Sequence, residues 1–177
     1  MRTRRRLAGF TLIEVLVTLA IIGVLGLVAV PSFVEFRRNA ELSDSVSNLM
    51  LAASTAKTAA LKSGRNAFVQ TKAATGWGSG WFVYVDTNWD NDYDAGTDEL
   101  VMEHAALSSD VTVGTSAGSL ASNYLMFNGA GFPRLTGGGN GNGSLVLSTK
   151  GRSSMVIVDT SGRTRSCKVG TTGCSAL

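Results

Sequence analysis

The chain has 177 residues, 44% of them hydrophobic, and its formal net charge is +3. That length allows one modest domain and one membrane segment, and it excludes a second core. The positive charge is concentrated at the two ends of the chain, residues 1–9 and 134–177. Residues 1–9 carry four Arg and no acid. Without these nine residues, 12 basic and 13 acidic groups remain, which is a net charge of −1. The overall charge therefore does not by itself indicate nucleic acid or anionic lipid as a partner.

The N-terminal segment has the features of an export and anchoring signal. An Arg cluster, which should stay in the cytoplasm, precedes a largely apolar run from Phe10 to Val30. As a helix at about 1.5 Å per residue the run spans about 31 Å, enough to cross a bilayer once. A secretory signal has its small cleavage-site residue after the apolar run, whereas Gly9 stands before it, so ordinary signal-peptide cleavage is the weaker interpretation.

Glu14 interrupts the apolar run. A carboxylate costs up to about 3 kcal/mol at the centre of a bilayer, so it usually has a function, although a carboxylate near the interface that reaches toward water costs less. Residues 9–17 around it read Gly-Phe-Thr-Leu-Ile-Glu-Val-Leu-Val. This pattern resembles the prepilin signature of type IV pilins and pseudopilins, and the resemblance covers roughly residues 1–35.

The resemblance implies how the N-terminus is processed and assembled. A prepilin peptidase would cleave between Gly9 and Phe10 on the cytoplasmic side, and the new amine of Phe10 would be N-methylated. Glu14 would then neutralise the amine of a neighbouring subunit in the filament, a pairing that is favourable at low dielectric. The implied partners are the peptidase, the inner membrane and other pilin subunits.

A second helical pattern follows the membrane run. Pro31 should kink or loosen the helix locally, and an amphipathic helix then continues to a stop at residues 63–64. Its apolar face consists of Leu42, Val46, Leu49, Met50, Ala53 and Ala60. The predicted organisation is a leader at 1–9, a transmembrane and polymerisation helix at 10–35, its amphipathic continuation at 36–63 and a β-rich domain at 64–177.

Short β-rich pieces separated by Gly, Ser, Asn and Asp make up the rest of the chain. The predicted strands are Ala67–Gln70, Trp81–Val85, Glu99–Glu103, Val111–Gly114, Asn123–Phe127, Ser144–Ser148, Met155–Asp159 and Arg163–Val169. One long helix followed only by strands predicts an α+β fold, in which the amphipathic half of the helix packs on an antiparallel sheet. The glycine-rich segment 137–143 has few side chains to pack and is predicted to be a mobile loop.

The β-rich part of the chain resembles one particular branch of the pilin family. Residues 81–88, 98–100 and 127–133 are similar to the FimT/GspH branch of the family, which comprises minor pilins and minor pseudopilins. The likeness implies a subunit that is made in few copies and that primes or caps a filament.

An acidic segment, residues 86–99, lies in a part of the chain without Lys or Arg. Its oxygen ligands at alternate positions resemble the first nine places of a calcium loop. Position six, however, is Asn91 instead of Gly, and position twelve is Thr97 instead of Glu. A hairpin connection is therefore the preferred interpretation, no metal site is predicted, and calcium binding stays an alternative.

The sequence contains no catalytic constellation and no cofactor motif, and the protein is not predicted to be an enzyme. Its one histidine, His104, is expected to be an ordinary residue at a strand end. Cys167 and Cys174, in a compartment that permits oxidation, predict one disulfide, which stabilises by about 2.5 kcal/mol on the chain-entropy estimate. Free thiols or a metal site are the alternatives.

The C-terminal segment is basic, with six basic groups and one acid in residues 134–177. Alternation along a strand places Arg163 and Arg165 on one face, about 7 Å apart. Two guanidinium groups at that spacing can each bind a phosphate of one nucleic-acid strand. Lys168 extends this basic track, with Lys150 and Arg152 as further candidates. From the residues alone, a solvated basic face is the commoner explanation.

Residues 162–165, Gly-Arg-Thr-Arg, resemble the GRxR motif of FimT-type pilins, which are implicated in DNA capture for natural transformation. The resemblance implies DNA binding by Gly162, Arg163, Arg165 and Lys168, without sequence specificity. Double-stranded DNA is favoured, because no aromatic side chains are interleaved for base stacking.

Two functions follow from these patterns. One is a minor type IV pilin with a single inner-membrane pass and a periplasmic C-terminal domain, which enters the pilus after assembly and captures DNA. The other is a purely structural GspH-type minor pseudopilin of a type II secretion system. The leader does not separate the two, because the resemblance implies the same peptidase and helix for both machines.

Overall fold

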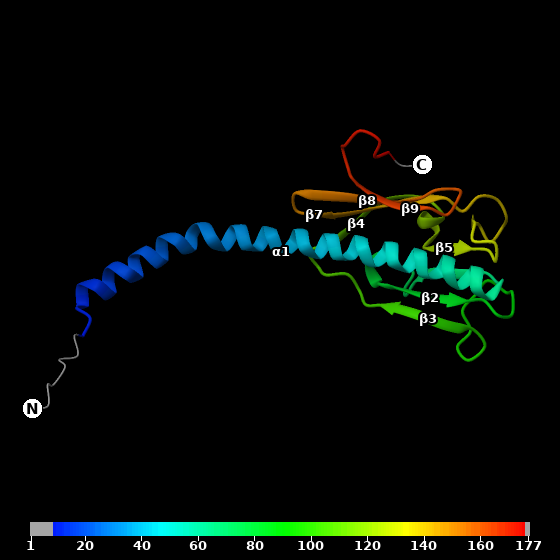
Figure 1. Ribbon diagram of the computed structural model, residues 1–177, viewed down its shortest axis with the longest axis horizontal. Helices are drawn as coiled ribbons and strands as arrows, with labels where there is room; N and C mark the ends of the chain where they lie inside the picture. The colour runs from blue at the N-terminus through cyan, green and yellow to red at the C-terminus, as the bar shows by residue number, and fades with distance from the viewer. Residues whose placement is uncertain (1–8, 176–177) are drawn as a thin grey trace, which may run out of the picture. The chain divides into compact units, whose positions relative to one another are not determined.

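The computed structural model describes residues 9–175, so most of the predicted leader, residues 1–8, lies outside the described part. The chain divides into two compact units, residues 1–37 and residues 38–177. One helix, α1 (Leu12–Ser63), contributes to both units (Figure 1).

In the described part of the chain, the first unit consists of residues 9–11 and the N-terminal part of α1. Most of its described large apolar side chains are exposed, for example Leu19 at 59% and Ile22 at 64%. The helix continues past Pro31, as predicted. Within residues 9–175 no single helix is long and apolar enough to cross a membrane, and only the segments Leu12–Leu25 and Val30–Ser63 taken together meet that criterion, by length and composition. The single membrane crossing therefore stays a prediction.

In the second unit, α1 buries one apolar stripe. Leu42, Leu49 and Ala53 are at most 2% exposed, and Ala56 and Ala60 are fully buried. Residues at this spacing share one face of a helix, so the predicted amphipathic pattern is confirmed.

The C-terminal end of α1 also lies where it was predicted. The helix ends at Ser63, and Gly64 follows with a φ of 67°. The Gly64 amide donates a hydrogen bond to the Ala60 carbonyl at 2.9 Å. Glycine is the usual residue in this left-handed position because it has no Cβ to clash with the backbone.

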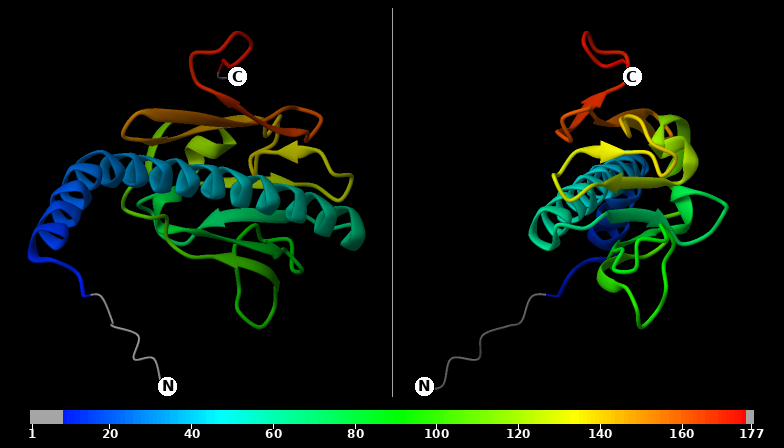
Figure 2. Two further views of the ribbon diagram at one scale, coloured as in Figure 1. Left: turned by 60° about the vertical axis from the view of Figure 1, so that its left-hand side comes forward. Right: turned by 90° about the vertical axis from the view of Figure 1, so that its right-hand side faces the viewer.

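Two antiparallel sheets follow α1, with the strand orders β3-β2-β1-β5-β6 and β4-β7-β8-β9. The first sheet contains β1 (Ala67–Thr71), β2 (Trp81–Val85), β3 (Glu99–His104), β5 (Tyr124–Phe127) and β6 (Pro133–Arg134). The second contains β4 (Thr112–Gly118), β7 (Gly143–Thr149), β8 (Arg152–Val158) and β9 (Thr164–Lys168). Two short 3-10 helices, η1 (Trp77–Ser79) and η2 (Ser119–Ser122), lie between strands. Figures 1 and 2 show the C-terminal half of α1 lying across both sheets.

The main core lies between α1 and the inner faces of both sheets. Residues that pair across strands share a face, and Val69, Val83 and Leu125 form such a row in the first sheet. Leu145 and Val156 are paired in the second sheet. All five are at most 1% exposed, and burial of this apolar surface is the main force that holds helix and sheets together. The α+β prediction is confirmed.

Three strand predictions differ from the structure by more than one residue at an end. β4 extends to Gly118 instead of ending at Gly114, β8 begins at Arg152 instead of Met155, and β6 was not predicted. β8 is longer than predicted because its pairing with β7 continues to the pair of Thr149 and Arg152, next to the turn that joins the two strands. The serines in this stretch are not among the β-branched and aromatic residues that are enriched in strands, so the sequence alone did not indicate a strand there.

The glycine-rich segment 137–143 is partly packed. Gly141 and Gly143 are buried, and the Gly141 carbonyl accepts a hydrogen bond from the Ser119 hydroxyl at 2.6 Å. A Cβ on Gly141 would overlap the backbone of Arg134. The prediction of a mobile loop is wrong for this end of the segment, because the missing side chains are what allow the backbones to approach.

Replacing Leu49 by Ala should lower the free energy of unfolding by about 2–5 kcal/mol, because it leaves a cavity in the core. Leu49 is 2% exposed, whereas Leu51 on another face of α1 is 52% exposed. Leu51→Ala is the matched control and should change the free energy of unfolding by less than about 0.5 kcal/mol. Denaturant unfolding of the full-length protein in detergent measures both, and equal losses would contradict this packing.

Candidate functional site

The predicted basic motif begins in the β8–β9 turn, which we define as Thr160–Gly162. The strands pair up to Val158 and Thr164, and a 3.1 Å hydrogen bond from the Asp159 amide to the Arg163 carbonyl extends the ladder by one residue. Gly162 closes this three-residue loop with a φ of 75°. A loop of this length needs a left-handed residue at its end, which explains the glycine.

The side chain of Asp159 accepts hydrogen bonds from Ser161 of the β8–β9 turn and from Arg163, which follows the turn. Its Oδ1 accepts hydrogen bonds from the Ser161 amide at 2.9 Å, the Ser161 hydroxyl at 2.6 Å and the Arg163 amide at 3.0 Å. The hydroxyl bond is the main cause that lowers the pKa of Asp159. The resulting stabilisation is complete above the pKa of an unfolded Asp, about 3.9, and is lost as the pH falls through the lowered pKa.

Arg163 and Arg165 lie on one face of the β8–β9 hairpin, as the alternation predicted. Arg165 is paired with Ile157 in the register, and Arg163, two residues earlier, lies opposite Asp159. Arg163 is exposed and Arg165 is half-buried. Within the described part of the chain neither guanidinium belongs to a salt bridge. The Arg163 guanidinium is therefore available to an anionic ligand, and Arg165 keeps further donors beside its one bond to the Gly173 carbonyl.

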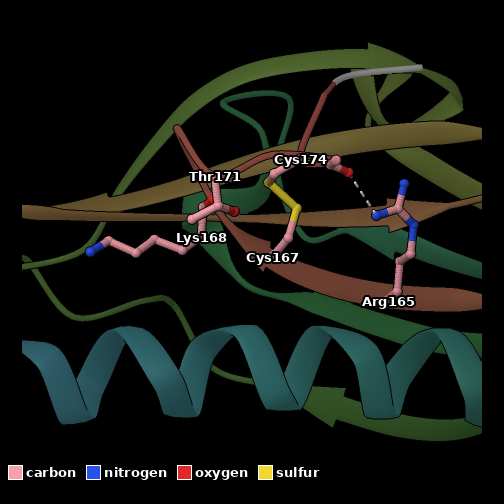
Figure 3. Close-up of a disulfide and its surroundings, with 6 residues drawn as sticks. Arg165, Cys167, Lys168, Thr171 and Cys174 are labelled. Atoms are coloured by element: carbon pink, nitrogen blue, oxygen red, sulfur yellow. Dashed lines mark hydrogen bonds between the residues drawn. A yellow bond between two sulfur atoms is a disulfide. The ribbon is translucent and has the colours of Figure 1, made fainter.

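Lys168 lies on the other face of β9. It is paired with Ser154 and stands three positions from Arg165, an odd number that reverses the face. Figure 3 shows its side chain pointing away from Arg165. Arg152, two residues before Ser154, shares the face of Lys168. The structure thus divides the predicted basic track into an arginine pair at the turn and a second group near the other end of β9.

Cys167 and Cys174 form a disulfide, with their Cα atoms 5.7 Å apart, so the predicted pairing is confirmed. The closed loop contacts the candidate site, because Nη1 of Arg165 donates to the Gly173 carbonyl at 3.3 Å (Figure 3). Within the loop, the Thr171 hydroxyl donates to the Lys168 carbonyl at 2.7 Å. The disulfide loop therefore constrains the direction of Arg165.

The acidic loop, residues 86–98, belongs to the other sheet, where it joins β2 to β3. Asp86 is fully buried and accepts hydrogen bonds from the amides of Trp89 and Asn91, at 2.6 and 3.1 Å. Asp98 accepts from two more loop amides. These bonds are those of a connection between strands. Within residues 9–175, no group of three or more His, Cys, Asp or Glu side chains is arranged to hold a metal ion.

His104 takes part in packing at the end of β3. Its ring stacks on that of Trp81, with the centroids 4.2 Å apart, and its Nδ1 lies 2.7 Å from the Ala105 carbonyl oxygen. These contacts are those of a structural strand-end residue.

The predicted cleavage site precedes α1. Gly9 and Phe10 are exposed and lie outside the helix. At the start of α1, Glu14 Oε2 accepts a hydrogen bond from the Thr11 amide at 2.9 Å, and the Glu14 amide donates to Thr11 Oγ1 at 3.3 Å. This reciprocal pair is a capping box. The sequence-based interpretation missed Thr11, although the Thr-x-x-Glu spacing signals such a cap.

Two family models match the chain. Residues 45–162 match the model described as type II transport protein GspH, and residues 4–30 match the prokaryotic N-terminal methylation motif. The first match covers more than half of the chain. The chain belongs to the GspH family. This GspH-family chain thus combines the family's β-rich part with an N-terminal methylation motif.

Solved structures show the same fold. The type IV minor pilin FimU of Pseudomonas aeruginosa, crystallised in two space groups, matches with TM-scores of 0.54 and 0.53 at 15% identity. The first match covers 73% of this chain and 90% of FimU. A stretch of 48 residues is 42% identical to the type IV major pilin protein PilA of Myxococcus xanthus. This stretch makes up 27% of this chain and 22% of PilA. At 15% identity the likeness to FimU establishes the fold alone.

Replacing Cys167 and Cys174 together by Ser should loosen the C-terminal segment and lower the free energy of unfolding by at most about 2.5 kcal/mol, because a short loop is no longer closed. The rest of the domain should stay folded, since the pair lies outside the main core. Intact-mass measurement after alkylation tests the pairing itself: the native protein should take up no label, and the reduced protein two. Two labelled cysteines in the unreduced protein would be evidence against the disulfide.

Proposed function

We propose that this protein is a minor type IV pilin that joins the pilus and binds DNA without sequence specificity, for uptake in natural transformation. The observation that carries the proposal is the arginine pair: Arg163 and Arg165 share one face of the β8–β9 hairpin and have no salt-bridge partner in the described part of the chain. Guanidinium groups about 7 Å apart on alternate strand residues match the recurrence of phosphates along one nucleic-acid strand. The role is binding and assembly, without catalysis.

The charge distribution favours an approach of DNA from the second sheet. Residues 134–177, which include β7, β8 and β9, carry six basic groups and one acid. Residues 73–133 carry eight acids and no Lys or Arg, and the acidic loop within them belongs to the first sheet. A duplex held against β9 therefore avoids the acidic loop. Lys168 and Arg152, on the other face of the same hairpin, would add long-range attraction.

We place the protein in the inner membrane with its β-rich domain in the periplasm, and in the pilus after assembly. The methylation-motif match at residues 4–30 supports this placement. In this proposal the prepilin peptidase cleaves between Gly9 and Phe10, which are exposed outside α1, and Phe10 is N-methylated. Glu14 caps its own helix through Thr11 before assembly, and it neutralises the Phe10 amine of a neighbouring subunit afterwards.

A second candidate function is a structural minor pseudopilin of a type II secretion system. The matched GspH model, described as a type II transport protein, favours it. In that role the arginine pair would be a solvated surface, and the same N-terminal processing would apply. DNA binding separates the two candidates.

Replacing Gly9 by a bulky residue such as Leu should leave the precursor uncut, because the proposed cleavage needs a small residue beside Phe10. Glu14→Ala should be cut normally but assemble poorly, since the neighbouring amine stays uncompensated at low dielectric. Mass spectrometry of the membrane-bound protein reads both outcomes. A mature N-terminus other than methylated Phe10 would rule out the proposed processing.

The full-length mature protein in nonionic detergent should bind duplexes of unrelated sequence with Kd values of about 10⁻⁴ to 10⁻⁶ M, because the contacts are electrostatic and non-specific. Raising the salt concentration should abolish binding. Arg163→Gln and Arg165→Gln should each weaken binding to every duplex and flatten the salt slope by roughly one unit per lost phosphate contact. Fluorescence anisotropy with labelled DNA at several salt concentrations measures both quantities.

Lys72→Gln is the matched control, because it removes the same charge from a lysine paired with Glu103 of the first sheet, at 3.0 Å. Its DNA affinity should stay close to that of the parent. In a transformable host, the protein with both arginines replaced should assemble into pili and fail in DNA uptake. If the parent does not bind DNA at low salt, or if the doubly substituted protein binds as well as the parent, the structural pseudopilin role is the better explanation.

A further inference from the structure

Lys57 connects α1 to the β8–β9 turn. Its Nζ donates hydrogen bonds to the Ser161 carbonyl at 3.1 Å and to the Gly162 carbonyl at 3.2 Å. The side chain is half-buried, and its two acceptors are 104 and 105 residues away in the chain. Two of the three donors of the ammonium group are therefore committed to the turn.

The backbone of the β8–β9 turn forms hydrogen bonds with two side chains, those of Asp159 and Lys57. Asp159 accepts from the amides of Ser161 and of Arg163, which follows the turn, and Lys57 donates to the carbonyls of Ser161 and Gly162. Gly162 is buried, and a Cβ there would lie 2.8 Å from the Gly131 carbonyl oxygen and 3.1 Å from both Lys57 Nζ and a Phe127 ring carbon. The backbone that leads directly into Arg163 is thus packed against the domain instead of projecting into solvent.

We propose that Lys57 is a positioning residue for DNA capture: by holding the Ser161 and Gly162 carbonyls, it presents Arg163 to a phosphate in a preformed orientation. This role rests on the proposed function of the arginine pair. A loop that is ordered before binding loses less conformational entropy when it binds, and affinity rises without any new contact. The Gly of the GRxR motif then contributes to binding through packing, because only glycine allows the turn to reach Lys57.

Lys57→Met should weaken binding to duplex DNA about threefold to tenfold. Without the two hydrogen bonds of Lys57, the β8–β9 turn is less ordered before binding and loses more conformational entropy when DNA binds. The salt slope should stay unchanged, because Arg163 still reaches its phosphate and the number of contacts is the same. If Lys57 itself contacted DNA, the slope would fall by about one unit. Lys57→Arg should restore most of the affinity, since a guanidinium can donate to both carbonyls. Lys62→Met, an exposed lysine of the same helix, controls for the lost charge.

A double-substitution cycle shows which arginine Lys57 acts through. With Arg163→Gln already present, Lys57→Met should weaken binding by less than about twofold, because its effect passes through Arg163. With Arg152→Gln present instead, it should keep its full effect, because Arg152 lies at the far end of β8. Amide hydrogen exchange without DNA gives a readout independent of binding: the Arg163 amide, bonded to Asp159, should exchange faster in Lys57→Met and at the parent rate in Lys62→Met.

The outcomes separate this role from DNA capture itself. If the parent binds DNA and Lys57→Met binds equally well, or exchanges its Arg163 amide at the parent rate, the positioning role is overturned and DNA capture stands. If the salt slope falls by about one unit in Lys57→Met, Lys57 is a phosphate contact and not a positioning residue. If the parent binds no DNA, the proposed function fails, and the positioning role fails with it.

Discussion

Four alanines of α1, at positions 52, 53, 56 and 60, are at most 1% exposed and face the main core. Their small side chains let the helix backbone approach the strands, so that side chains from the inner faces of both sheets meet around one helix. The two sheets have separate strand orders and share no strand. The contact of α1 with both sheets is therefore the constraint on which the rest of the domain depends. Lys57 follows directly after Ala56 in this contact, and the packing that buries the alanines also brings its ammonium group to the β8–β9 turn.

The same arrangement separates opposite charges. The groove on one side of α1 is lined in part by Glu99 and Val101 of β3, and the groove on the other side by Gly162 and Thr164 of the β8–β9 hairpin. The acidic loop is attached to the first of these edges and the arginine pair to the second. The helix lies between the two grooves, and in the described residues no salt bridge joins the acidic loop to the arginine pair. The near-neutral net charge of residues 10–177 thus coexists with a basic edge, which overall composition conceals.

Local patterns predicted those parts of the fold that depend on local forces. Residues 81–85 are β-branched and aromatic, and their strand bounds were predicted correctly; the helix stop followed from Gly64. The disulfide was predicted from the spacing of Cys167 and Cys174 and the expected compartment. The two-residue strand β6 begins with a proline and has no pattern of its own. Lys57 could not be predicted, because an amphipathic pattern marks it only as polar and its partners lie about 100 residues away. The reversed face of Lys168, by contrast, follows from counting along β9.

An edge strand that holds DNA has a mechanical difficulty, because β9 is paired on one side only, with β8. A pull on Arg163 would act at the turn, where a hairpin opens from its end. The structure supports β9 at both ends. At the turn, Lys57 ties the backbone to α1 and Asp159 ties it to itself; at the other end, the disulfide closes the chain onto the strand at Cys167. In the proposed pilin, α1 is also the helix that continues into the polymerising segment. A load on the bound DNA therefore reaches the filament helix through one side chain, without first passing through the hydrogen bonds of the sheet.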